Sequence, residues 1–356
     1  MHIRFPSFRG LARGPSFTGL VGLLVVLGVL GATPASAAAP PQTRVDRLRD
    51  SDLRIARVAY RLSVANRELC RNVLAPQLGF VVHGLEQYDP ADREEAARAF
   101  ALGPNPGVMA VVEGSPADSA GLRAGDQLLF VNGRDLGSGD RAAGAAPTRA
   151  LVERARQILA EEMARGAAFL RISRAGIARD MQFAAELGCP ALVELVPGED
   201  VNAWADGARI VVSAGLLARC ATDADLALVI GHELAHNLLR HGRKPSPAAR
   251  DAALFSLLPE IGPIGSSERE EEADRLAVRL AGAAAYDLGG AEAFLGGLLK
   301  AEAGDAAIAT HSRPARRLAL LRAVIADLAG APHLAEADDS AVIAKASATG
   351  LVSGRM

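Results

Sequence analysis

Two histidines, His232 and His236, stand four residues apart with Glu233 directly after the first. The surrounding run, 222–241, has apolar residues at helical spacing and acids in its first turn, which predicts an α-helix. A helix places residues four apart on one face, so both imidazoles can bind one metal ion. Glu233 lies about 100° round the helix, within reach of a water molecule beside that ion. The pattern predicts one Zn²⁺ per chain, with Glu233 as general base.

Such a zinc site needs a third protein ligand, and the motif helix offers none in a suitable place. His241 follows the second histidine by five residues and is rotated from it by about 140°. The alternative spacing, with a histidine six residues after the second one, is absent. A second predicted helix begins with an acidic run, and spacing alone leaves Glu270 and Glu271 hard to separate. Its other acids, Glu268 and Glu272, are expected to face elsewhere.

Four segments of the C-terminal half resemble the CAAX-prenyl-protease and HtpX-like family of zinc metallopeptidases, which are gluzincins. The resemblance covers about 190–325 and implies a mainly helical zincin core with a short sheet. It implies an endopeptidase that hydrolyses peptide bonds with a metal-activated water. The matching segments are G-H-E-L-A-H at 231–236, E-x-x-x-D at 270–274, a strand pattern at 202–217, and Thr310-His311 followed by Arg317.

This resemblance also assigns residue roles. Glu270 becomes the third metal ligand, and Asp274 holds a metal-binding histidine by a hydrogen bond. His311 and Arg317 would lie near the metal as catalytic residues that gate it or stabilise an oxyanion. Zinc peptidases commonly hold substrate as an added strand at a sheet edge, and we expect the strand at 208–213 to provide that edge.

A second resemblance lies upstream, where residues 111–133 match the centre of a PDZ domain of the kind found in bacterial envelope proteases. Short β-like runs separated by turn signals over 76–186 predict a small β-rich domain with one helix, at 148–165. A PDZ domain would bind peptide C-termini by strand addition. Gly79 and Phe80, within Q-L-G-F, then match the loop whose backbone N–H groups hold the peptide carboxylate. The alternative for these two residues is an ordinary strand start.

The N-terminus has the pattern of an export signal. Arginines precede an apolar run at 20–32, and the small-residue site A-S-A ends at Ala37. The apolar run is shorter than the roughly 20 residues that a membrane-spanning helix needs. We therefore expect residues 1–37 to be a cleaved signal peptide and not an uncleaved anchor. The expected location is the periplasm, with no stable membrane span after cleavage.

Two of the three cysteines bracket the PDZ-like insertion. Cys70 ends a predicted amphipathic helix at 44–70, and Cys189 opens the predicted peptidase core. Because export makes oxidation possible, we expect a Cys70–Cys189 disulfide, with Cys220 left over and buried. The alternative is three unpaired thiols.

Charge argues against a nucleic-acid partner, because 39 basic residues face 41 acidic ones and no basic excess exists. The sequence predicts an α+β protein of two domains that degrades unfolded or misfolded polypeptides in envelope quality control. The alternative is an inactive or self-blocked zincin that serves as a PDZ-containing chaperone or scaffold. The expected divisions are a signal peptide at 1–37, a linker and an N-terminal helix packing on the protease core at 38–75, the PDZ-like domain at 76–186, the zinc metallopeptidase domain at 187–335 and a loose tail at 336–356.

Overall fold

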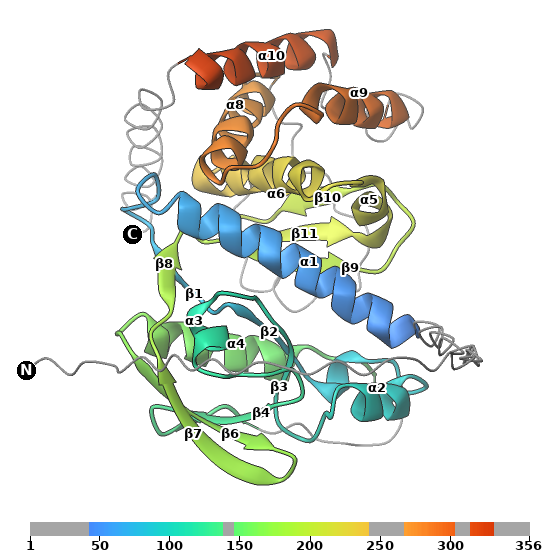
Figure 1. The fold of residues 1–356 in the computed structure, drawn as a ribbon. Helices are drawn as coiled ribbons and strands as arrows, with labels where there is room; N and C mark the ends of the chain where they lie inside the picture. Colours follow the sequence, from blue (N-terminus) through green and yellow to red (C-terminus); the bar gives the residue numbers. More distant parts are fainter. Residues whose placement is uncertain (1–42, 138–145, 242–266, 303–313, 331–356) are drawn as a thin grey trace, which may run out of the picture. The chain divides into compact units, whose positions relative to one another are not determined.

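The computed structural model of this protein describes residues 43–137, 146–241, 267–302 and 314–330. Figure 1 shows a β-rich region and a separate, mainly helical region, so the predicted α+β class with two domains is confirmed. We call them the PDZ region and the peptidase region, after the domains predicted for them. Among the described helices, none combines the length and apolarity needed to cross a membrane. The predicted signal peptide and C-terminal tail lie outside the described residues.

Helix α1 (Arg44–Ala65) opens the described chain. A capping box at Thr43 begins it, and its apolar stripe is buried. The helix ends earlier than residue 70, because the Asn66 side chain turns back on it. The Asn66 Nδ2 atom donates to the Leu62 carbonyl at 2.8 Å and to the Leu280 carbonyl at 3.0 Å. The end of α1 is thus tied to a helix of the peptidase region.

The PDZ region is built on one antiparallel sheet in the order β2-β3-β4-β6-β7, with β5 beside β4. Buried and exposed residues alternate along β6, as expected for a strand with one face on the core. Strand β2 stands at one end of the sheet order. The elements are β2 (Phe80–His83), η1 (Leu85–Gln87), α2 (Arg93–Ala99), β3 (Gly107–Val111), α3 (Pro116–Ser119), β4 (Gln127–Val131), β5 (Arg134–Asp135), α4 (Ala150–Met163), β6 (Ala168–Arg174) and β7 (Ile177–Phe183).

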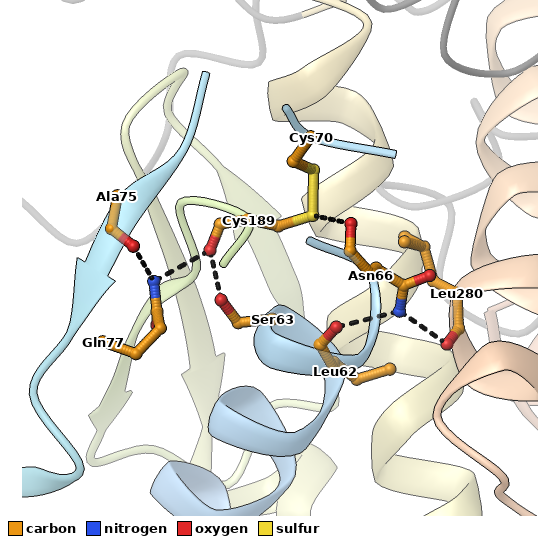
Figure 2. Close-up of a disulfide and its surroundings, with 8 residues drawn as sticks. All are labelled: Leu62, Ser63, Asn66, Cys70, Ala75, Gln77, Cys189 and Leu280. Atoms are coloured by element: carbon orange, nitrogen blue, oxygen red, sulfur yellow. Dashed lines mark hydrogen bonds between the residues drawn. A yellow bond between two sulfur atoms is a disulfide. The ribbon is translucent and has the colours of Figure 1, made fainter. Parts of the chain in front are cut away.

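The neck of the PDZ region is a two-stranded ribbon of β1 (Ala75–Gln77) and β8 (Glu186–Gly188), closed by a Cys70–Cys189 disulfide (Figure 2). The Cys189 carbonyl accepts hydrogen bonds from Ser63 Oγ and, at 3.0 Å, from Gln77 Nε2. Gln77 is the last residue of β1. Its side-chain amide therefore links this strand directly to Cys189.

We expect removal of this disulfide to destabilise the chain strongly. The bridge joins residues separated by 119 positions. In the chain-entropy account, closing a loop of that size stabilises the folded state by about 4–5 kcal/mol. Denaturant unfolding of the Cys70→Ser/Cys189→Ser variant, compared with a Cys220→Ser control, measures the difference. Equal unfolding midpoints for the two variants under non-reducing conditions would contradict the prediction.

The peptidase region contains a small sheet in the order β10-β11-β9. Strand β11 is central, antiparallel to β10 and parallel to β9. The expectation that residues 208–213 offer a free edge to substrate is therefore wrong, since both sides of β11 are already paired. The strand pattern expected at 202–217 also ends early, at Ser213. Ser213 Oγ accepts from the Leu216 N–H at 3.1 Å and caps a helix that follows the strand. The elements are β9 (Leu192–Val196), β10 (Ala203–Ala205), β11 (Arg209–Ser213) and α5 (Ala214–Arg219).

Among the described residues, this region also contains four longer helices, of which α6 and α8 position the motif residues. A capping box at Thr222 begins α6. Gly231 lets α8 approach closely, because a Cβ atom there would lie 3.2 Å from the Ala277 carbonyl oxygen. This contact brings the acidic start of α8 within reach of the motif histidines. The helices are α6 (Asp223–Leu238), α8 (Ser267–Ala283), α9 (Ala291–Glu302) and α10 (Pro314–Gly330).

A buried carboxylate joins α4 of the PDZ region to the peptidase sheet. Glu194, on β9, has a side chain only 3% exposed and accepts from Arg149 and, at 2.8 Å, from Arg156. Arg209 Nη1, on β11, lies 3.6 Å from the other carboxylate oxygen of Glu194. The Arg156 side chain also donates to the Val82 carbonyl of β2 at 3.3 Å. The sequence analysis did not predict this cluster, although an acid within the apolar run L-V-E-L-V could have indicated it.

Replacing Glu194 with Ala is expected to lower the free energy of unfolding by about 3 kcal/mol, since it leaves half-buried guanidinium groups without their counter-charge. Glu161→Ala is the matched control, because its ion pair with Arg134 is largely exposed and is worth about 0–1 kcal/mol. Urea unfolding of both variants gives the comparison. Equal losses would show that the buried cluster contributes no more than a surface pair.

Candidate metal centre

Three side chains from α6 and α8 converge on one point. The Nε2 atoms of His232 and His236 lie 3.0 Å apart. The Glu270 carboxylate lies 3.3 Å from His232 Nε2 and 3.6 Å from His236 Nε2. Within the described parts of the chain, this is the one cluster whose ligand atoms could hold a metal ion, all within 4.8 Å of one another.

The chemistry of this cluster fits zinc. Two imidazole nitrogens and a carboxylate oxygen form the His₂Glu set of catalytic zinc sites, which leave a further position for water or substrate. The Glu270 side chain is only 3% exposed. With both imidazoles neutral, nitrogen lone pairs and a carboxylate face each other in a buried place, which is unfavourable unless a cation lies between them. His232, His236 and Glu270 are therefore the residues that would hold the metal.

A second layer of contacts orients His232. Its Nδ1 atom lies 3.0 Å from Asp274 Oδ1. Burial would lower the pKa of His232, but without a metal ion the Asp274 and Glu270 carboxylates raise it to about 10. A bound zinc ion would therefore replace the proton that His232 otherwise carries. Burial would raise the pKa of Asp274, but Arg317 and His232 lower it to about 2. Asp274 is thus a charged acceptor that directs the other ring nitrogen of His232 towards Glu270.

Arg317, on α10, is buried and donates two hydrogen bonds to Asp274, at 2.7 and 2.8 Å. This contact places Arg317 behind the site as support for Asp274. Its expected contribution to an oxyanion remains a prediction. His311, the other residue expected near the metal, lies outside the described residues.

The structure distinguishes Glu270 from Glu271 as the third metal ligand, which helical spacing alone could not do. Glu270 faces the histidines, whereas Glu271 accepts from Arg316 Nη2 at 2.9 Å. Both carboxylates are buried. Because neighbouring residues on a helix point about 100° apart, only one of them can face the motif histidines.

Glu233 is half-buried on α6 beside His232. Its carboxylate contributes to the raised pKa of His232, which shows that the two groups interact electrostatically. This position is compatible with a base that receives a proton from a water molecule next to the histidines.

Asn237 was not identified from the sequence, yet it connects the motif helix to the sheet. Its Oδ1 atom accepts from the Gly207 N–H at 2.7 Å, and its Nδ2 atom donates to the Arg209 carbonyl at 3.1 Å. Both partners belong to the β10–β11 hairpin. Strand β10, which carries Trp204 and stands at one end of this sheet, is thereby fixed beside α6.

The predicted peptide-binding residues lie at the start of β2. Gly79 has φ +72°, and a Cβ atom there would lie 2.6 Å from the Ser115 Cβ atom, so this position requires glycine. The Gly79 carbonyl accepts from the Val112 N–H at 2.8 Å. The Phe80 ring is buried against Phe183. Both residues therefore shape the end strand of the PDZ sheet, whereas their contact with a peptide carboxylate remains a prediction.

Comparisons with known proteins agree with these two regions. Residues 175–258 match the family description Peptidase family M48, and residues 107–146 match the PDZ domain. The first match includes His232, Glu233 and His236. A search of curated proteins found no significant match. The chain thus carries a metallopeptidase domain with a PDZ domain, and peptides or proteins are the substrates that this combination indicates.

Proposed function

We propose that this protein is an exported zinc-dependent endopeptidase of the CAAX-prenyl-protease and HtpX-like type that acts in envelope protein quality control. The observation that carries the proposal is the convergence of His232, His236 and Glu270 on one point beside Glu233. The match to peptidase family M48 supports the same chemistry. The export signal pattern at 1–37 supports a periplasmic location.

The mechanism assigns distinct tasks to the residues of α6 and α8. When bound, zinc supplies a Lewis acid that polarises the substrate carbonyl and lowers the pKa of water. Glu233 accepts the water proton on its carboxylate and later donates it to the amine of the leaving peptide. Asp274, held by Arg317, keeps His232 in the orientation seen here. Glu270 adds negative charge to the ligand set without taking part in proton transfer.

The substrate would enter as an extended strand. Since β11 is paired on both sides, the end strand β10 is the edge of this sheet nearest α6. Backbone hydrogen bonds to β10 would hold any unfolded polypeptide, because strand addition uses groups that every residue carries. The PDZ domain would bind peptide C-termini along β2, the corresponding end strand of its own sheet.

Cleavage of casein by the purified chain, with and without a chelator, tests the proposal. We expect endoproteolytic fragments, loss of cleavage after chelation and recovery with one equivalent of zinc. Absence of cleavage by fully zinc-loaded protein would favour the inactive scaffold. Cleavage that resists chelation would overturn the metal mechanism.

Two further measurements address location and the PDZ domain. N-terminal sequencing of protein from the periplasmic fraction should begin at residue 38, and material confined to the membrane would indicate an anchor. A peptide with a free C-terminus should bind more tightly than its amidated form. Equal affinities would remove the carboxylate loop at Gly79 and Phe80 from the proposal.

A further inference from the structure

His241 lies against the outer nitrogen of a motif histidine. Its Nδ1 atom is 3.2 Å from His236 Nδ1, and its Nε2 atom is 3.2 Å from Glu272 Oε2. The two imidazole rings meet edge to face, with centroids 5.2 Å apart. Glu272 is not one of the converging metal ligands, and its contact with His241 was not predicted from the sequence.

The end of α6 explains how His241 reaches this position. The rotation of about 140° assumed a helix that continues to residue 241, but α6 ends at Leu238. Arg240 then adopts a left-handed conformation with φ +56°. The His241 N–H donates to the His236 carbonyl at 2.9 Å, which closes the turn and folds the His241 ring back onto His236.

The hydrogen-bonding capacities of the three groups fix one consistent arrangement of protons. A histidine that binds metal through Nε2 carries its proton on Nδ1 and needs an acceptor there. His241 Nδ1 can accept only when the His241 proton is on Nε2. The Glu272 carboxylate, an acceptor, lies at that nitrogen. In this arrangement each donor faces an acceptor: His236 Nδ1 donates to His241 Nδ1, and His241 Nε2 donates to the Glu272 carboxylate.

We infer that His241 is a positioning residue that holds His236 ready for the metal, with Glu272 behind it. The inference rests on the proposed zinc site. It gives His236 the kind of support that Asp274 and Arg317 give His232. His241 carries most of the effect, because its side chain is 9% exposed whereas that of Glu272 is 59% exposed and competes with water.

Zinc affinity of the full-length protein, measured by competition with a chromophoric chelator, tests this role. His241→Ala should weaken zinc binding about 10–100-fold, the usual effect of losing a partner behind a metal ligand. His241→Asn should recover most of the affinity, because its amide oxygen can occupy the place of Nδ1. Glu272→Ala should weaken binding by no more than about 5-fold, as expected for an exposed partner. Glu268→Ala, on the same helix and exposed, is the control and should bind zinc like the parent.

The visible spectrum of the Co²⁺-substituted protein supplies a second readout that activity does not. We expect His241→Ala to change the spectrum and His241→Asn to restore it. Parental affinity and spectrum in His241→Ala would overturn the inference. Equal losses of zinc affinity in His241→Ala and His241→Asn, together with a lower unfolding midpoint of the metal-free chain, would also overturn it. That result would show that His241 has a purely structural role. If the parent protein itself binds no zinc, the proposed function fails instead.

Discussion

Glu233→Gln is expected to lose at least ~100-fold of the peptidase activity while its zinc content stays near one per chain. Glutamine fills the same space but cannot take the proton of the attacking water, and general bases typically contribute 10²–10⁴-fold. Glu233 is not among the three converging ligand atoms, so metal binding should survive. Metal analysis and casein cleavage on the same preparation measure both quantities.

Glu268→Gln is the matched control for this experiment, because it makes the same chemical change on an exposed part of α8. It should leave both zinc content and cleavage unaltered. Unchanged turnover in Glu233→Gln would remove the general base from the mechanism. Loss of zinc in Glu233→Gln would instead show that this residue supports the metal site.

The motif helix was predictable because its signals are local. Capping at Thr222, helical spacing of apolar residues and the pair His232 and His236 all lie within one short segment. Strand β4 (Gln127–Val131) likewise lies within 76–186, where short β-like runs separated by turns were expected. Where hydrophobic period and turn residues agree, neighbouring sequence is sufficient to define an element.

The parts that sequence reasoning missed depend on contacts between distant segments. Pairing of β11 on both sides follows from β9 and β10, which no local pattern of 208–213 reveals. The position of His241 depends on a left-handed Arg240 at the helix end. Arg317 was expected near the metal, but its hydrogen bonds to Asp274 were not predicted, because they depend on the packing of α10 against α8.

The two glutamates on α8 depend both on a local sequence pattern and on packing between distant segments. Sequence spacing left Glu270 and Glu271 open, and the family resemblance assigned Glu270. The structure turns Glu270 to the histidines and Glu271 to Arg316. The difference depends on the rotation of α8 about its axis, which close packing at Gly231 fixes.

Glu270→Ala is therefore expected to remove zinc and activity together. Two histidines hold Zn²⁺ poorly, so loss of the third ligand should weaken binding by more than ~100-fold, beyond what loss of an outer partner causes. Glu271→Ala should keep its zinc, because it loses only an ion pair with Arg316, whose side chain is 57% exposed. Dialysis against low zinc, followed by metal analysis, separates the two variants. If Glu271→Ala loses the metal and Glu270→Ala keeps it, helix α8 is rotated by one residue relative to α6, and the geometry that supports the mechanism is wrong.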